Sequence, residues 1–304
     1  MSKRMIWGID LGGTKIEGVV LDRQSNNQVI LRKRLATEAD RGYEHILHQI
    51  KKLIGEMSDE VGDRPEIIGI GTPGALDPHT RLLKNSNSTA LNGKAFKTDL
   101  ETLLGIPIKI ANDANCFALA ETRIGVVKDI CPEAEVVFGV IMGTGVGGGV
   151  VVRGRVINGS QGIGGEWGHN FLDESGGECY CGKTGCVERV IAGPSLQRYY
   201  HEISGREKTL KEIVALGATG DPYAQQTLDR LVHFFGLGIS AVINILDPDI
   251  IVLGGGVGNI EILYTKGVEA AAKHTFNTRF DTRIVKPKLG DSAGVFGAAF
   301  LVEE

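Results

Sequence analysis

The sequence is poor in proline and contains no long apolar run. Only nine of its 304 residues are proline, whereas 43 are glycine, about twice the usual share. Glycine without proline is typical of close backbone approaches in an ordered fold. The longest apolar stretch, residues 136–152, is interrupted by six glycines and is too short to cross a bilayer. Because Asp10 follows the first few apolar residues, no signal-peptide core is expected, and the sequence predicts a cytoplasmic protein without membrane contact.

The sequence also lacks an excess of either charge. It has 33 basic and 37 acidic residues, a formal net charge of −4, so nothing favours binding to nucleic acid. The apolar share of 42% and charged share of 23% are those of a soluble globular protein. Five cysteines, an odd number, argue against a disulfide framework in a chain without an export signal.

Strands alternate with helices along the first part of the chain. A strand, a glycine turn and a second strand open the sequence, and apolar residues over 43–57 recur at helical spacing. This alternation predicts an α/β fold with a mixed, largely buried sheet. The strands are expected at residues 6–10, 16–21, 30–36, 67–71 and 106–110, and the helices at 43–57 and about 116–124.

The pattern then begins again. Residues 139–145 (Gly-Val-Ile-Met-Gly-Thr-Gly) echo residues 8–14 (Gly-Ile-Asp-Leu-Gly-Gly-Thr), which indicates two related halves, although glycine turns also resemble one another by chance. We expect strands at 136–142, 150–152 and 250–253, a glycine turn at 143–149, and helices at 233–246 and 293–302, the last capped by Ser292. Residues 206–230 predict helices and indicate no chemistry.

Three glycine clusters follow strands, where exposed backbone amides suit phosphate oxygens. They are Gly12-Gly13-Thr14-Lys15, Gly143-Thr144-Gly145 with the glycines up to 149, and Gly254-Gly255-Gly256. The spacing within 143–148 matches the dinucleotide fingerprint, but a strand-like segment follows it where that fold needs a helix, so we reject a Rossmann site. No Walker-type phosphate loop occurs.

Asp10 stands in an apolar strand just before the first glycine turn. A buried carboxylate is costly unless it is paired or binds a metal. Beside a phosphate-binding turn it is suited to hold hydrated Mg²⁺, with Thr14 and Lys15 donating to phosphate. A turn-capping aspartate and a solvated lysine are the alternatives.

Cysteines and a histidine gather in the middle of the chain. His169 is followed by Cys179, Cys181 and Cys186, with glycines that permit a tight knuckle. Three thiolates and one imidazole make a closed tetrahedral site, so we expect structural zinc; unligated reduced cysteines are the alternative.

Several polar residues are placed where sugar chemistry needs them. Asp113 follows a strand directly, where α/β sheets bind ligands, although it could instead cap a helix. Asn112 and Asn115 flank it with amides. Glu166 and Glu188 lie on either side of the Cys-His cluster, which would fix two carboxylates for bonding to sugar hydroxyls.

Together these motifs resemble the ROK family of bacterial sugar kinases, from end to end. They are Asp10-Leu-Gly-Gly-Thr-Lys15, Ala111-Asn-Asp-Ala-Asn115, Gly143-Thr-Gly-Val-Gly147, Gly165-Glu-Trp-Gly-His169, Cys179-x-Cys-Gly-x-x-Gly-Cys186-x-Glu188 and Leu253-Gly-Gly-Gly256. The resemblance implies an α/β, actin-like ATPase fold, with two domains around a cleft that takes ATP, Mg²⁺ and a sugar. We expect a smaller domain at residues 1–117, completed by the C-terminal helix at about 291–304, and a larger one at 118–290.

The resemblance also implies roles for single residues. Asp113 matches the catalytic base for transfer of the γ-phosphoryl group of ATP to the 6-hydroxyl of a hexose. The positions that match sugar contacts are Gly74, Asn87, Asn112, Asp113, Glu166, His169 and Glu188, with His169 also a zinc ligand. Those that match nucleotide contacts are Asp10, Gly12, Gly13, Thr14, Lys15, Gly143, Thr144, Gly145, Gly254, Gly255, Gly256 and Val257.

Within the family, residues 84–93 and 179–183 are most similar to manno(fructo)kinases, which favours fructose or mannose as the sugar. N-acetylglucosamine kinase or glucokinase is the alternative, and a homodimer is expected. The family's repressors carry a DNA-binding region before the first glycine turn, for which this sequence leaves no room. From other classes, a sugar sensor without catalysis and an ATPase without a sugar remain, although the first needs no Asp113 and the second no Glu166 and Glu188.

Overall fold

The computed structural model describes residues 5–303, which form two compact α/β units. Unit 1 consists of residues up to 130, residues 154–164 and those from 289 onward; unit 2 consists of 131–153 and 165–288. The first boundary therefore lies after 130, where the sequence had suggested 117. The reason is that helix α3 (Asp113–Arg123) packs against α11 (Ala293–Phe300) within unit 1, so closely that a Cβ at Gly297 would overlap the carbonyl of Cys116.

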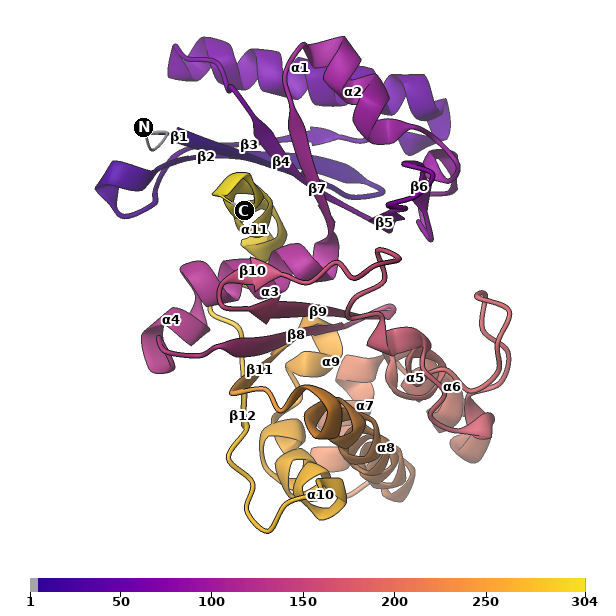
Figure 1. The fold of residues 1–304 in the computed structure, drawn as a ribbon. Coiled ribbons are helices and arrows are strands. Elements are labelled where there is room, and N and C mark those ends of the chain that lie inside the picture. The colour runs from indigo at the N-terminus through magenta and orange to yellow at the C-terminus, as the bar shows by residue number, and fades with distance from the viewer. Residues whose placement is uncertain (1–4, 304) are drawn as a thin grey trace. The chain divides into compact units, whose positions relative to one another are not determined.

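Unit 1 is built on a five-stranded sheet in the order β3-β2-β1-β4-β7. Strands β1, β2 and β3 pair antiparallel, whereas β4 and β7 continue the sheet parallel to β1. Helices α1 and α2 lie on one face and α11 on the other (Figure 1). The bounds are β1 Met5–Leu11, β2 Lys15–Asp22, β3 Gln28–Ala36, α1 Tyr43–Val61, β4 Ile68–Thr72, β5 Ala75–Leu76, β6 Leu83–Lys84, α2 Phe96–Leu104, β7 Ile108–Asn112 and α4 Val126–Ile130.

The helical spacing read from the sequence is confirmed in α1, whose apolar face lies in the core of unit 1. Its fully or nearly buried side chains are Ile46, Leu47, Ile50, Leu53, Ile54 and Met57. They pack with Trp7 and Ile9 of β1 and with Ile68 of β4. Helix α1 thereby covers this face of the sheet with apolar side chains. The polar candidate residues lie instead at the ends of the strands.

Unit 2 repeats this plan with four strands in the order β9-β8-β11-β12. Strands β8 and β9 form an antiparallel hairpin, and β11 and β12 run parallel to β8, just as β4 and β7 run parallel to β1. The internal repeat seen in the sequence therefore corresponds to a repeated arrangement of strands. The bounds are β8 Val136–Met142, β9 Val146–Val152, β11 Ile250–Gly254 and β12 Arg283–Val285; the short strand β10 (Arg155–Val156) belongs to the part of unit 1 at residues 154–164.

The glycine turn of unit 2 is shorter than the sequence suggested. Strand β9 begins at Val146, so residues 147–149 belong to the strand and only Gly143-Thr144-Gly145 form the turn. The glycines of the strand serve close packing, because a Cβ at Gly148 would overlap the carbonyl of Gly165. Glycine thus marks a tight contact here, not a loop.

The helices of unit 2 surround the central helix α8, which starts at Pro222 after an Asp221 cap, well before the predicted residue 233. By length and composition α8 could cross a membrane, but 56% of its most apolar window is buried in the protein, as in a core helix. Trp167 anchors on it by donating its indole N–H to Gly238 O (3.1 Å). The bounds are α5 Val187–Ile191, α6 Gly193–Ser204, α7 Leu210–Ala218, α8 Pro222–Leu246, α9 Gly255–Gly258 and α10 Lys266–His274.

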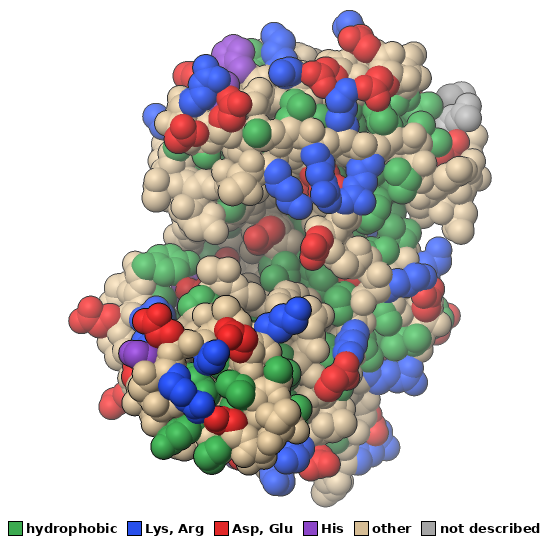
Figure 2. Space-filling model, turned by 180° about the vertical axis from the view of Figure 1, so that it is seen from behind, with side chains coloured by type: hydrophobic (Ala, Val, Ile, Leu, Met, Phe, Trp, Pro, Cys, Tyr) green, Lys and Arg blue, Asp and Glu red, His purple; other side chains and the backbone are tan. Residues whose placement is uncertain are grey.

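The face drawn in Figure 2 carries side chains of both charges. Acidic and basic side chains are mostly mixed on it, but several basic side chains lie together in one group. This agrees with the small net charge of −4.

Candidate active site

The β1–β2 turn carries the first glycine cluster. Gly12 donates its N–H to Lys15 O (2.9 Å), and its carbonyl accepts from Thr37 Oγ1 (2.7 Å). The amide of Gly12 is therefore used within the turn, and the role of Gly12 in phosphate binding stays a prediction. In this turn, the backbone N–H groups of the exposed residues Gly13 and Thr14 remain as candidates for binding a phosphate.

Asp10 lies at the end of β1, beside this turn, and is only partly exposed. Loss of water around it raises the pKa of its carboxyl to about 6, and the negative charges of Asp113 and Glu17 add to the effect while Lys15 opposes it. The N-terminal part of α11 contributes to the loss of water around Asp10, because it packs closely against this carboxyl: a Cβ at Gly294 would lie 3.0 Å from Asp10 Oδ2. A carboxylate held in an unfavourable negative field fits a divalent cation, and its oxygens suit Mg²⁺.

Asp113 begins α3 but does not cap it. The cap is Asn112, whose Oδ1 accepts from Asn115 N–H (2.8 Å), so the alternative of a structural cap at Asp113 is wrong. The Asp113 side chain is exposed, and its Oδ1 accepts from Ala114 N–H (2.8 Å). Desolvation by surrounding protein raises the pKa of its carboxyl, although backbone hydrogen bonds oppose the shift. An accessible carboxylate with a raised pKa is suited to accept a proton.

The other sugar candidates of unit 1 differ in their surroundings. Asn112 and Asn115 are buried and line a cavity of about 180 Å³. Gly74, with φ +97°, forms the turn between β4 and β5. Asn87 is exposed on a loop whose shape is fixed by Asn92, which bonds both the N–H and the carbonyl of Ser86 (2.8 Å each). Asn115 thus lies in the interior, and Asn112 uses its side-chain oxygen for the cap.

A cationic cluster beside the first turn was not expected from the sequence. The carboxylate of Glu17 is fully buried and forms ion pairs with basic side chains. Arg32 forms one of them, Arg34 Nε lies 2.9 Å from Glu17 Oε2, and Lys15 Nζ lies 4.0 Å from the same oxygen. Arg32 also donates to Ser292 Oγ, so Ser292 does not cap α11 with its side chain as predicted. The alternation of two arginines along β3 is the signal that could have indicated this cluster.

The second glycine turn is tied to an acid of the predicted sugar site. Gly143 donates its N–H to Gly145 O (2.8 Å), and Val146 donates its N–H to Glu188 Oε2 (2.9 Å). These bonds use the amides on either side of Thr144 and Gly145, the two residues left as candidates for phosphate. In the third cluster, Gly254 ends β11 and Gly255, Gly256 and Val257 form the short helix α9.

The predicted metal ligands converge. One ligand atom each from His169, Cys179, Cys181 and Cys186 lies within 4.8 Å of all the others. Cys181 Sγ and Cys186 Sγ are 3.6 Å apart, and Cys179 Sγ lies 3.7 Å from His169 Nδ1. Tetrahedral zinc with Zn–S bonds of about 2.3 Å places sulfurs about 3.8 Å apart, so these four residues could hold one zinc ion.

Electrostatics at the cluster also favour a cation. The pKa of Cys186 is raised to about 12. Burial is the largest cause, and the neighbouring thiols Cys181 and Cys179 add to it. By contrast, and although burial opposes the shift, the pKa of Cys181 is lowered by its hydrogen bonds with Lys183 N–H and with the neighbouring thiols. A divalent metal would stabilise all three side chains as thiolates. Cys186 is in addition the residue from which α5 begins, two positions before Glu188. The metal ligands therefore fix the start of the helix that carries Glu188.

Tyr180 joins this cluster to the predicted sugar carboxylates, and the sequence analysis missed it. Its hydroxyl lies 3.0 Å from His169 Nε2, and the two rings meet edge to face at 5.2 Å. Burial raises the pKa of the Tyr180 phenol to about 12, with further contributions from Glu188, Cys179 and Glu166. Both glutamates are thus close enough to act on the exposed Tyr180. A tyrosine between two metal-ligand cysteines is the signal that could have found it.

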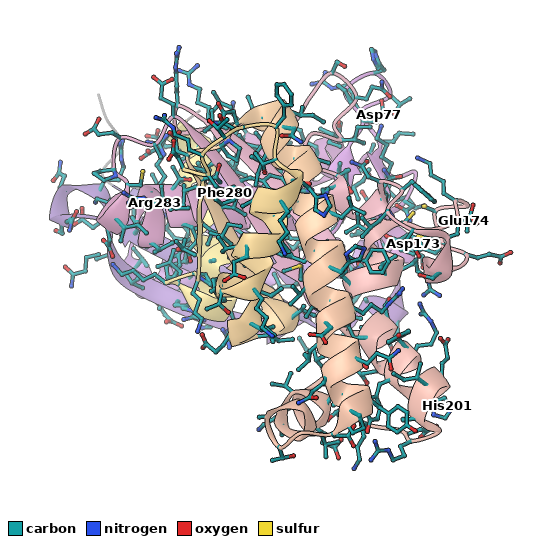
Figure 3. The ribbon with its side chains drawn as sticks, turned by 90° about the horizontal axis from the view of Figure 1, so that it is seen from below. Asp77, Asp173, Glu174, His201, Phe280 and Arg283 are labelled. Carbon is teal, nitrogen blue, oxygen red and sulfur yellow. The ribbon has the colours of Figure 1, made fainter. Side chains whose placement is uncertain are left out.

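The loop between His169 and Cys179 is anchored on helices. Asp173 and Glu174 lie on this loop (Figure 3), and the adjacent Ser175 Oγ accepts from Arg230 Nη2 of α8 (2.6 Å). Arg230 lies over the rings of Tyr199 and Phe234, at 4.6 and 4.5 Å from their centroids. The cluster is thereby supported on a rigid part of unit 2.

Comparison with known proteins finds similar proteins over nearly the whole chain. The model of the ROK family matches residues 6–304. An N-acetyl-D-glucosamine kinase of Aliivibrio salmonicida is 34% identical over 307 aligned positions, covering 98% of this chain and 99% of that protein. A ROK hexokinase from Thermus thermophilus superposes with a TM-score of 0.86 at 32% identity, covering 98% of this chain and 97% of that one. A ROK family glucokinase from Streptomyces griseus, solved with glucose and AMPPNP, gives 0.76 at 26% identity, covering 98% of both chains.

The chain belongs to the ROK family, and its fold is the actin-like ATPase fold of that family. Its general activity is ATP-dependent phosphorylation of a sugar.

Proposed function

We propose that the protein is an ATP-dependent N-acetylglucosamine kinase. The proposal differs from the fructose or mannose preferred on sequence motifs, because eight curated relatives at 33–34% identity are all N-acetylglucosamine kinases. They support the sugar that the sequence motifs gave as an alternative. The observation within the site that carries the proposal is the Cys-His cluster, whose His169 Nε2 lies 3.0 Å from the Tyr180 hydroxyl and from whose Cys186 the helix with Glu188 begins.

In this proposal Asp113 is the catalytic base. It accepts the proton of the sugar 6-hydroxyl while that oxygen forms a bond to the γ-phosphorus of ATP, and the bond from that phosphorus to the β,γ-bridging oxygen breaks to release ADP. Asp10 would hold Mg²⁺, and this ion would supply positive charge near the phosphate oxygens. Amides of Gly13, Thr14, Thr144 and Gly145 orient the phosphates, because positioning and electrostatics carry most of the catalysis in phosphoryl transfer.

The sugar hydroxyls are bound by carboxylates and an imidazole. Each carboxylate accepts from two hydroxyls, and His169 acts through Nε2, since Nδ1 is the atom that faces Cys179. With Nδ1 on zinc, Nε2 must carry the proton and donates it in a hydrogen bond to Tyr180 or to a sugar oxygen. We propose that zinc is structural, because four protein ligands leave no open position.

An ADP-release assay with ATP and Mg²⁺ tests the proposal. N-acetylglucosamine, glucose, mannose and fructose are compared in parallel, with a sugar-free blank. We expect N-acetylglucosamine to give the highest kcat/KM. A clear lead for fructose or mannose would restore the first interpretation of the motifs, whereas no stimulation by any sugar would overturn the proposed site and favour a sugar sensor. A homodimer and a cytoplasmic location remain predictions from the sequence.

A further inference from the structure

The β8–β9 turn is bonded at both ends to the segment that carries Glu188, entirely within unit 2. At one end, Glu188 Oε2 accepts from Val146 N–H (2.9 Å). At the other, Gly193, which begins α6 five residues after Glu188, donates its N–H to Gly143 O (2.8 Å). The carbonyl of Glu188 accepts from Ser195 Oγ (2.9 Å), which holds the segment itself in shape. A shift of the turn relative to this segment would therefore break at least one of these two hydrogen bonds.

The second sugar-binding segment contacts the same residue of the turn. Gly168, between Glu166 and His169, lies so close to Val146 that a Cβ would overlap its carbonyl oxygen. The amide of Val146 is therefore bonded by one proposed sugar-binding segment and its carbonyl is covered by the other. Val146 follows directly on Gly145, one of the two residues left as candidates for phosphate.

We propose that Glu188 is a positioning residue for the phosphate turn, and that its carboxylate couples sugar binding to nucleotide binding. This inference rests on the proposed function. Both carboxylate oxygens belong to one rigid planar group, of which Oε2 already accepts from Val146 N–H. A sugar hydroxyl bonded to the same carboxylate restricts its rotation and so stabilises the acceptor that shapes the turn. By linkage, a turn ordered by nucleotide holds the carboxylate ready for the sugar, and the two effects are equal in size.

Gly145 offers a test in the reverse direction. A Cβ at Gly145 would overlap Glu188 Oε2, whereas a Cβ at Gly143 would meet only Gly256 N at 3.9 Å, an ordinary contact. Neither glycine has a positive φ, so alanine suits the backbone at both positions. In Gly145→Ala the carboxylate, the flexible end of a side chain, must rotate away, and the fold is retained. Gly143→Ala is the matched control.

We expect Gly145→Ala to weaken binding of N-acetylglucosamine about tenfold in the absence of nucleotide, because one hydrogen bond to a charged group is worth about that factor. Gly143→Ala should change it less than twofold. Isothermal titration calorimetry measures both. A Gly145→Ala protein with the sugar affinity of Gly143→Ala would overturn the inference.

The forward direction is tested with Mg-ADP and no sugar. Glu188→Ala should weaken Mg-ADP binding about fivefold to tenfold, and Glu188→Gln should restore most of the loss, since its amide oxygen can still accept from Val146 N–H. Glu166→Ala, which lacks the bond to the turn, should bind Mg-ADP as wild type does. Equal Mg-ADP affinity in Glu188→Ala and Glu166→Ala would overturn the coupling.

These outcomes are separate from failure of the proposed function. If wild type binds none of the four sugars and releases no ADP with them, the proposed function fails. If wild type phosphorylates a sugar but the glycine and glutamate variants behave alike, the function stands and the coupling fails.

Discussion

Asp10→Asn is expected to make the metal-free protein more stable and to remove its activity. Burial and neighbouring acids raise the pKa of Asp10 from about 3.8 to about 6. Since one pKa unit corresponds to about 1.4 kcal/mol, ionised Asp10 costs the folded state about 3 kcal/mol at neutral pH. Below about pH 3 the group is protonated in both folded and unfolded chains, and the cost vanishes. As the pH rises from about 3 to 6, the unfolded chain loses this proton first, so wild type loses stability over this window, whereas Asp10→Asn does not.

The measurement uses the two tryptophans, of which Trp7 lies in unit 1 and Trp167 in unit 2. In a Trp167→Phe background, the fluorescence of Trp7 reports unfolding of unit 1 by urea. With chelator present, the gain in free energy of unfolding from Asp10→Asn should grow from about 0.5 kcal/mol at pH 4 to about 3 kcal/mol at pH 8. With Mg-ATP present, only the protein that retains Asp10 should gain stability. A gain that is absent, or equal at all pH values, would refute the electrostatic argument.

Three further variants test the rest of the site. Asp113→Ala should lower kcat on the order of 10²-fold or more while Mg-ADP affinity stays within about twofold, and near-normal turnover in the ADP-release assay would show that Asp113 is not the base. Cys181→Ser should lose zinc by elemental analysis and weaken sugar binding about tenfold, because the start of α5 and with it Glu188 would move; a zinc-free protein with unchanged sugar affinity would contradict this coupling. Tyr180→Phe should keep its zinc but raise the sugar KM a few-fold, since His169 Nε2 loses its partner; unchanged KM and kcat would show that Tyr180 plays no part.

The sequence predicted the alternation of strands and helices, the mixed sheet, the internal repeat and the convergence of the Cys-His cluster, because each depends on local pattern. Alternating apolar strands, the periodic face of α1 and the cysteine spacing are legible in single segments. What it could not predict depends on contacts between distant segments. The boundary after residue 130 follows from the packing of α3 on α11, which are about 180 residues apart in the chain.

The same limit applies at the site. Glycine spacing suggested a turn from 143 to 149. Position 148 requires glycine, however, because the backbone of Gly165 approaches it closely. A contact between two separate segments cannot be recognised from a local pattern. Asp113 could be a cap or a base until the structure placed Asn112 at the cap. Val146 contacts Glu188 through its backbone N–H, which every residue except proline has. The type of residue at position 146 therefore gives no indication of this hydrogen bond.

The β1–β2 and β8–β9 hairpins are similar in sequence and in pairing, but they differ in the residue pair that lies just before the turn. In unit 1, Asp10 is paired across the hairpin with Glu17; at the corresponding position in unit 2, Ile141 is paired with Gly147. One hairpin plan therefore serves two different purposes. In unit 1 the paired acids give the end of the hairpin a negative charge that can attract a cation. In unit 2 the corresponding pair carries no charge, and the glycines of β9 let neighbouring segments approach the strand closely.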